Sequence, residues 1–165
     1  PAIKAALTKR ARQNPFRTDA DYIRSRIRPR DKFNTPRCRG DAGRCSASIH
    51  KGLDLVAPIG TPLYPIEAGV VTSAGNAKGK WWRNGKFVSY RTNSGLQVKY
   101  IHLSSYSVRA GQKVDLSTVL GRVGITGNAS ADNPHVHIQV RNNKGVVAQF
   151  FCKIVKITKK NELLI

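Results

Sequence analysis

The sequence predicts a mainly β protein: a compact antiparallel β-sheet or sandwich-like domain that follows a basic, partly helical N-terminal arm. From about residue 48 onward, short apolar runs alternate with turns rich in Gly, Pro, Asn and Ser, which is typical of antiparallel strands. Strands do not alternate with long helical patterns, which disfavours a doubly wound fold. The 165 residues, 40% of them hydrophobic, suffice for one modest core. We therefore divide the chain into an arm and lead-in (1–45), a main domain (46–150) and a C-terminal strand or tail (151–165).

The arm, residues 1–32, is expected to contain two short helices. Good helix formers extend to Arg12, Asn14-Pro15 interrupts them, and Thr18-Asp19-Ala20-Asp21 suits the cap of a second helix. Residues 33–47 hold prolines, glycines and two cysteines, and predict an irregular lead-in.

The main domain is expected to consist of short strands joined by turns. Between residues 74 and 85 the chain is polar and rich in glycine, which predicts a surface loop. Its paired Trp81 and Trp82 are expected either to stack on sugar or line a substrate groove, or to cover the edge of the core. The predicted strands are 49–56, 63–66, 69–74, 86–92, 96–102, 119–123 and 135–141, with a further strand at 149–157.

The strand at 135–141 carries two histidines on one face. Successive strand side chains point to opposite faces, so His135 and His137 share one face. Val136, Ile138 and Val140 share the other. One face is therefore expected to be packed, while the other presents two imidazoles side by side.

A second histidine strand is predicted at 49–56. Here His50, Gly52 and Asp54 share a face, and the glycine leaves room between the imidazole and the carboxylate. A helix would also bring His50 and Asp54 together, but Gly52 and the prolines that follow weaken a helix. Two histidines and one aspartate are a normal ligand set for a hydrolytic zinc site, which keeps a fourth position open.

Four motifs in this order resemble those of the lysostaphin/LytM-type zinc metalloendopeptidases, which cleave peptide cross-links or stems in bacterial peptidoglycan. The resemblance covers about residues 39–140 and includes every histidine in the chain. Each motif alone is weak, and their combination is specific. The motifs are His50-Lys51-Gly52-Leu53-Asp54-Leu55, Pro58-Ile59-Gly60-Thr61-Pro62-Leu63, Tyr100-Ile101-His102-Leu103 and His135-Val136-His137.

The resemblance implies a role for each histidine. His50, Asp54 and His137 would bind one zinc ion per chain, and His102 and His135 would be catalytic groups outside the ligand set. Peptide hydrolysis needs a general base and a group that stabilises the oxyanion. We assign His135 as the base and His102 as the stabiliser. Without the resemblance, His102 would be an ordinary strand-end histidine, and Tyr100, two residues before it, is expected to pack in the core rather than contact a substrate.

The charge of the chain is strongly positive. Lys and Arg number 29 against 9 Asp and Glu, a net charge of +20, and the basic residues occur in both the arm and the main domain. Such a surface favours polyanions, including acidic cell-wall polymers. This distribution argues against a detachable nucleic-acid tail, so peptidoglycan rather than nucleic acid is the expected main partner. The arm is expected either to pack its apolar residues on the main domain or to bind a wall polymer, phosphate or a virion.

The sequence shows neither a membrane span nor a signal peptide. No apolar run approaches the roughly 18 residues that a span requires. The first ten residues lack an apolar middle, and the chain has no methionine, so we expect a processed product. The expected site of action is extracytoplasmic: the periplasm, the cell wall, the secreted fraction or a phage virion. Cys38 and Cys45 are close enough in sequence to close a small loop, and Cys152 is remote.

Two other classes of function remain as alternatives. One is a catalytically inactive or latent relative that serves as a cell-wall-binding or regulatory protein. Such relatives usually lose ligands or catalytic histidines, and this sequence lacks none of them. The other is a nucleic-acid-binding or virion structural protein with a purely structural zinc site, which predicts steeply salt-dependent DNA binding.

Overall fold

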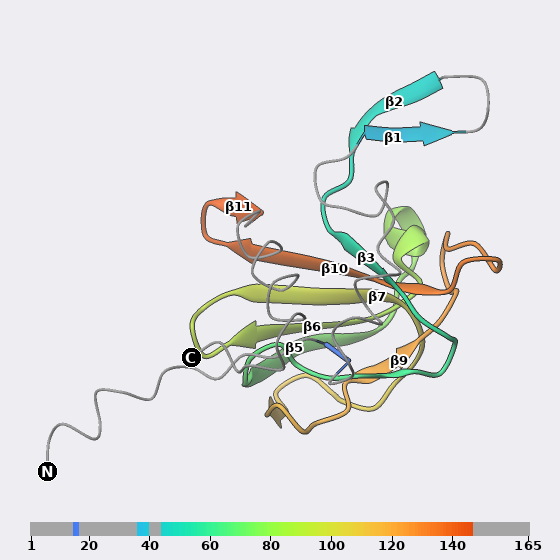
Figure 1. Cartoon of the computed structure of the whole chain (residues 1–165). Coiled ribbons are helices and arrows are strands. Elements are labelled where there is room, and N and C mark those ends of the chain that lie inside the picture. Colours follow the sequence, from blue (N-terminus) through green and yellow to red (C-terminus); the bar gives the residue numbers. More distant parts are fainter. Residues whose placement is uncertain (1–14, 17–35, 40–43, 147–165) are drawn as a thin grey trace, which may run out of the picture.

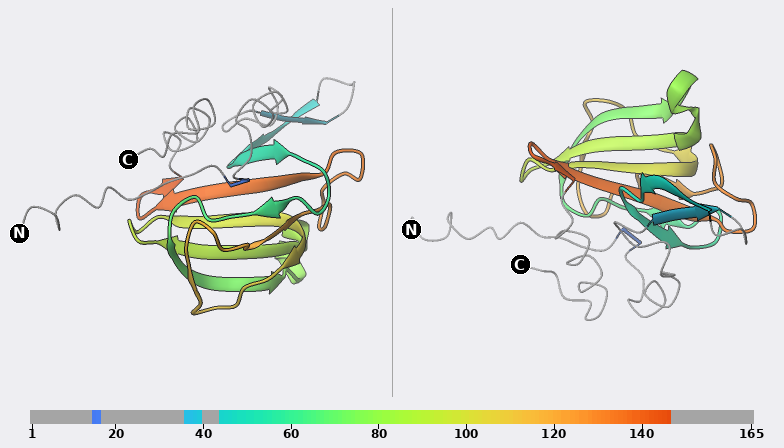
Figure 2. Two further views of the ribbon diagram at one scale, coloured as in Figure 1. Left: turned by 60° about the horizontal axis from the view of Figure 1, so that its bottom comes forward. Right: turned by 90° about the horizontal axis from the view of Figure 1, so that it is seen from above.

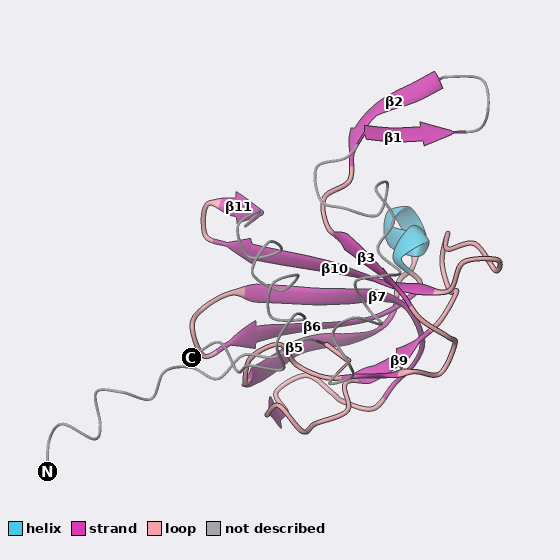
Figure 3. Cartoon of the chain, in the orientation of Figure 1, coloured by secondary structure: helices cyan, strands magenta, loops and turns pink. Residues whose placement is uncertain are grey.

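A computed structural model describes residues 15–16, 36–39 and 44–146 of the chain (Figure 1). Within this part the regular secondary structure is β, apart from one short 3-10 helix (Figure 3). The predicted mainly β, antiparallel fold class is therefore confirmed. The predicted arm helices and the strand at 149–157 lie outside the described residues, apart from Pro15 and Phe16. None of the described helices is long and apolar enough to cross a membrane.

Nine of the described strands form one antiparallel sheet, and every pairing in it is antiparallel. Its main path runs β11-β10-β7-β6-β5-β8, with β3 beside β10 and β9 between β4 and β7. Figure 2 shows the sheet as a curved layer with β3 alongside β10. The strands are β3 (Leu53–Val56), β4 (Pro62–Leu63), β5 (Gly69–Asn76), β6 (Lys86–Thr92), β7 (Gln97–Tyr106), β8 (Lys113–Val114), β9 (Gly121–Val123), β10 (His135–Asn142) and β11 (Gly145–Val146).

The hydrophobic core lies against one face of this sheet, as the predicted alternation requires. In β10, Val136, Ile138 and Val140 are fully buried in the core cluster, which confirms the apolar face predicted for this strand. The far end of β7 pairs with β9, and β9 pairs with β4, so these segments contribute Leu63 and Val123 to the same core. The opposite face of β10 is thereby left to the two histidines.

Of the two described residues of the N-terminal arm, Phe16 belongs to the core. Phe16 is buried in the core cluster, and the Tyr64 backbone N–H donates to the Pro15 carbonyl oxygen over 2.7 Å. At this position, the expectation that apolar residues of the arm pack on the main domain is confirmed.

The region before the first motif differs from the prediction. Part of the predicted irregular lead-in forms a hairpin of β1 (Pro36–Arg39) and β2 (Arg44–Ile49), with Cys38 opposite Cys45. These strands are polar and lack the apolar alternation by which strands are recognised. The predicted continuous strand 49–56 is also wrong, because β2 ends at Ile49 and β3 begins at Leu53. His50 therefore lies on a loop between two strands.

The predicted loop at 74–85 is at the surface, but it is more ordered in structure than expected. Strand β5 extends to Asn76, and the 3-10 helix η3 (Gly79–Asn84) follows with no buried residue. Trp81 is 61% exposed and Trp82 53% exposed. The interpretation that these side chains cover the edge of the core is therefore wrong. The two-residue strands β8 and β11 were not predicted, because so short a segment carries no periodicity.

Val140 in β10 is fully buried and Val70 in β5 is partly exposed, so truncating them should lower the free energy of unfolding by different amounts. Val140→Ala removes two methyl groups from a fully buried site and should lower the free energy of unfolding by about 2–3 kcal/mol. Val70→Ala, in β5 at a side chain that is 38% exposed, should cost about 1 kcal/mol or less. Urea denaturation of both variants measures the difference. Equal losses would contradict this assignment of the core.

Candidate metal centre

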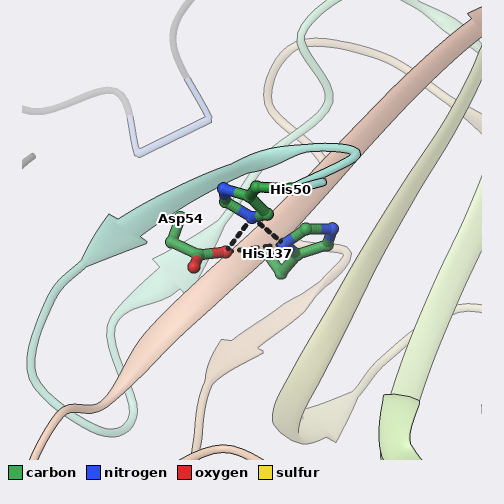
Figure 4. A group of neighbouring side chains, drawn as sticks. All are labelled: His50, Asp54 and His137. Carbon is green, nitrogen blue, oxygen red and sulfur yellow. Dashed lines mark hydrogen bonds and ion pairs between the residues drawn. The ribbon is translucent and has the colours of Figure 1, made fainter. Parts of the chain in front are cut away.

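Three side chains from separate segments converge at one edge of the sheet (Figure 4). His137 Nδ1 lies 2.6 Å from Asp54 Oδ1, and His50 Nε2 lies 3.0 Å from the same oxygen. The two imidazole nitrogens, His50 Nε2 and His137 Nδ1, are 2.9 Å apart. All three residues are buried, and this is the group within the described residues that could hold a metal ion.

The strand register explains how two of these residues meet. β3 and β10 pair antiparallel with His137 directly opposite Asp54, so their side chains project from the same face at neighbouring positions. His50 reaches them from the loop that precedes β3. Gly52 in this loop packs against the site: a Cβ there would overlap the His137 ring and the Ile138 carbonyl oxygen. Sequence alternation therefore placed His137 and Asp54 correctly, whereas His50 arrives by a loop.

The chemistry of the three donors fits a divalent cation such as zinc. Burial disfavours the ionised carboxylate, but hydrogen bonds and charge interactions with His137 and His50 hold the pKa of Asp54 well below its usual range. The site thus offers one carboxylate oxygen and two imidazole nitrogens, which is a common zinc ligand set. His50 Nε2 and His137 Nδ1 are 2.9 Å apart, so they cannot both carry a proton directed at each other. The cluster therefore suits a bound cation better than two protonated rings.

His135 lies beside this cluster. Its Nδ1–H donates to the Asn133 carbonyl oxygen over 2.8 Å, which directs the opposite ring nitrogen into the site. His135 Nε2 is 3.9 Å from Asp54 Oδ1. Its ring also contacts that of His102, with the centroids 4.9 Å apart. The site therefore holds four imidazoles and one carboxylate.

A β-bulge turns His102 toward this group. Between Tyr100 and Leu103, β7 has one residue more than the facing segment of β6. Tyr100 and Leu103 are both in the core, while Ile101 lies opposite His137 on the other face. The extra residue is His102, which has a φ of 67°, a left-handed conformation that residues other than glycine rarely adopt. The bulge therefore separates Tyr100 from His102, which simple alternation had placed on one face, and the core role predicted for Tyr100 is confirmed.

A backbone carbonyl holds the His102 ring in place. His102 Nδ1–H donates to the Thr126 carbonyl oxygen over 2.9 Å. The Thr126 hydroxyl in turn donates to the Leu103 carbonyl oxygen and accepts the Lys86 N–H. Burial and the electrostatic interaction with the neighbouring His135 ring lower the pKa of His102 to about 4, although the Thr126 hydrogen bond opposes this. At neutral pH the ring is therefore uncharged, with its lone pair on Nε2.

The sequence reasoning missed two contributors to the site. Gln139 Nε2 lies 3.2 Å from His137 Nε2, so Gln139 contacts the outer ring nitrogen of His137. Its alternation with His135 and His137 could have placed it on this face. The Thr126 carbonyl carried no signal, because a backbone acceptor has no residue type to recognise.

The sequence matches peptidase family M23 over residues 48–149. The chain therefore belongs to this family of peptidoglycan-cleaving zinc metallopeptidases, and the resemblance to lysostaphin-type enzymes is confirmed.

Similarity to individual proteins supports the assignment. The peptidoglycan DD-endopeptidase ShyC of Vibrio cholerae is 32% identical over 121 residues, which cover 72% of this chain and 26% of ShyC. A zinc-containing peptidase from Vibrio cholerae has a TM-score of 0.62 at 26% identity, covering 82% of this chain and 39% of that one. The catalytic domain of lysostaphin from Staphylococcus simulans, with a TM-score of 0.63 at 24% identity, shares the fold over 84% of this chain and 98% of the domain. The chain spans less than a third of the length of the curated relatives it matches first.

The tight contact at Gly52 predicts a selective effect on metal binding. Gly52→Ala should displace the His137 ring and weaken zinc affinity by about tenfold or more, while most of the sheet remains folded. Gly75→Ala is the matched control, because a Cβ there meets nothing within 4 Å. Zinc competition with a coloured chelator measures both. Unchanged affinity in Gly52→Ala would show that His137 does not need this packing to bind metal.

Proposed function

We propose that this chain is a zinc-dependent endopeptidase that hydrolyses peptide cross-links or stem peptides of bacterial peptidoglycan outside the cytoplasm. The observation that carries the proposal is the position of two further imidazoles, His102 and His135, beside the three clustered donors His50, Asp54 and His137. A structural zinc site is closed by protein ligands and needs no adjacent proton-transfer groups. The names of relatives such as ShyC, a peptidoglycan DD-endopeptidase, support the choice of substrate.

In this proposal the two groups of residues have different tasks. His50, Asp54 and His137 hold the zinc, which when bound polarises the scissile carbonyl and lowers the pKa of water. His135 is the general base, because its Nε2 points toward the donor cluster while Asn133 fixes its other nitrogen. His102 stabilises the developing oxyanion. Because the proton of the neutral His102 ring is on Nδ1, its Nε2 can donate to the oxyanion only when the ring is protonated, whereas the proton of the attacking water goes to His135.

The first test combines metal content with hydrolysis. One equivalent of zinc per chain and chelator-sensitive release of muropeptides, both lost in His137→Ala, are the expected results, because that variant lacks one of three ligands. Mass spectrometry of the products identifies the bond that is cut. Circular dichroism of the variant controls for folding. Bound zinc with no product from several types of cell wall would favour the inactive, wall-binding alternative.

Glutamine substitutions separate the roles of the two outer histidines. His102→Ala and His135→Ala should each retain zinc and lower kcat/KM by roughly 100-fold or more. A glutamine amide can donate a hydrogen bond, but it cannot act as a base at neutral pH. His102→Gln should therefore recover part of the activity lost in His102→Ala, whereas His135→Gln should recover none. Recovery at position 135 alone would reverse the two roles.

A further inference from the structure

A groove with a volume of about 600 Å³ lies on the sheet face that carries the histidines. It begins next to the metal centre, since Gln139 lines the groove and contacts His137. In β10, His137, Gln139 and Arg141 follow one another on the same face, so the groove continues the line of the site along the strand. Trp81 of η3 forms part of its wall. A peptide that reaches the metal centre along β10 would occupy this groove.

The groove is cationic. Lys51, Lys99 and Arg141 line it, and none of the described lining residues is acidic. Gln97 and Gln139 add amide groups that can donate hydrogen bonds. A carboxylate would therefore meet three positive charges and several neutral donors here.

Lys99 lies at the centre of the groove floor, where a cation is costly. It stands between Gln139 of β10 and Ser89 of β6 in the strand register. The side chain is half-buried, and burial together with the charge of Arg141 lowers its pKa. Within the described part of the chain Lys99 has no carboxylate partner, and its Nζ lies 4.8 Å from the centroid of the Phe87 ring. A half-buried ammonium next to a second cation, without an anion, is unfavourable unless a ligand supplies one.

The rise per residue of a strand gives the distance between the metal centre and the cations that would bind a substrate carboxylate. Two residues along a strand advance about 7 Å, so Gln139 and its partner Lys99 lie one such step from His137, and Arg141 lies two steps away. An extended peptide also advances about 7 Å for every two residues. A carboxylate two to four residues from the scissile bond would reach these cations.

We propose that this groove is a carboxylate-reading subsite in which Lys99 and Arg141 make the enzyme select anionic stem peptides over uncharged glycine-rich bridges. This proposal rests on the function proposed above and specifies its substrate class. A glycine bridge has no side-chain carboxylate, so it would leave Lys99 and Arg141 without an anionic partner. The general basicity of the chain does not account for the feature, because Lys99 is on the groove floor and not among the exposed lysines.

The test uses one cross-linked muropeptide in two forms, one with its free carboxylates intact and one with them converted to amides. The zinc-loaded full chain should show a kcat/KM about tenfold higher for the carboxylate form. Lys99→Met and Arg141→Gln should each reduce this ratio severalfold, and the double variant should bring it close to one. Added salt should also reduce the ratio in the unsubstituted protein.

Two exposed residues away from the groove provide matched controls. Lys113→Met in β8 and Arg109→Gln in the preceding loop remove the same charges and should leave the ratio as in the unsubstituted protein. A ratio near one in the unsubstituted protein would overturn the subsite, as would an equal fall of the ratio in the control variants.

Binding measurements separate failure of the subsite from failure of the proposed function. If neither form is cleaved, the proposed function fails, and calorimetry with the zinc-loaded protein still decides the subsite. Tighter binding of the carboxylate form that Lys99→Met abolishes would support the groove. Equal binding of the two forms would refute it.

Discussion

The antiparallel pairing of β3 with β10 is the constraint on which the candidate site depends. It sets His137 directly opposite Asp54, and the same ladder sets His135 opposite Val56. A shift of one residue in this register would turn His135 and His137 toward the core and expose Val136 and Ile138. The fully buried apolar face of β10 therefore fixes the position of the ligands on its other face. Folding energy and metal geometry are coupled through a single strand.

The sequence was sufficient for those features that follow from alternation. The two faces of β10 and the positions of most strands came from periodicity, and the donors His50, Asp54 and His137 were identified by the resemblance to the zinc endopeptidases. Alternation failed where the backbone departs from regular strand geometry. The loop that carries His50 and the bulge at His102 depend on pairing between distant segments, which local sequence does not specify.

The two faces of the sheet have different roles. One face is closed by aliphatic and tyrosine side chains, so its contribution is stability. The other carries imidazoles near one end of β10 and cations farther along, so its contribution is chemistry and charge. Because neighbouring residues of one strand serve different faces, substitutions at Gln139 or Lys99 can alter the polar face without removing core contacts. This separation allows one fold to support different substrate preferences.

The left-handed backbone at His102 has a consequence for the balance between stability and activity. A residue that carries a Cβ is strained in this region by about 1–2 kcal/mol, and asparagine and aspartate tolerate it best. The protein therefore holds the His102 imidazole at an unfavourable backbone position, and glycine or asparagine there would relieve the strain while removing the ring. That relief is opposed by the loss of the ring's hydrogen bond to the Thr126 carbonyl oxygen and of its contact with His135. Backbone strain and side-chain contacts thus act in opposite directions at this position, so thermal stability alone would be a poor guide to whether a variant of it still functions.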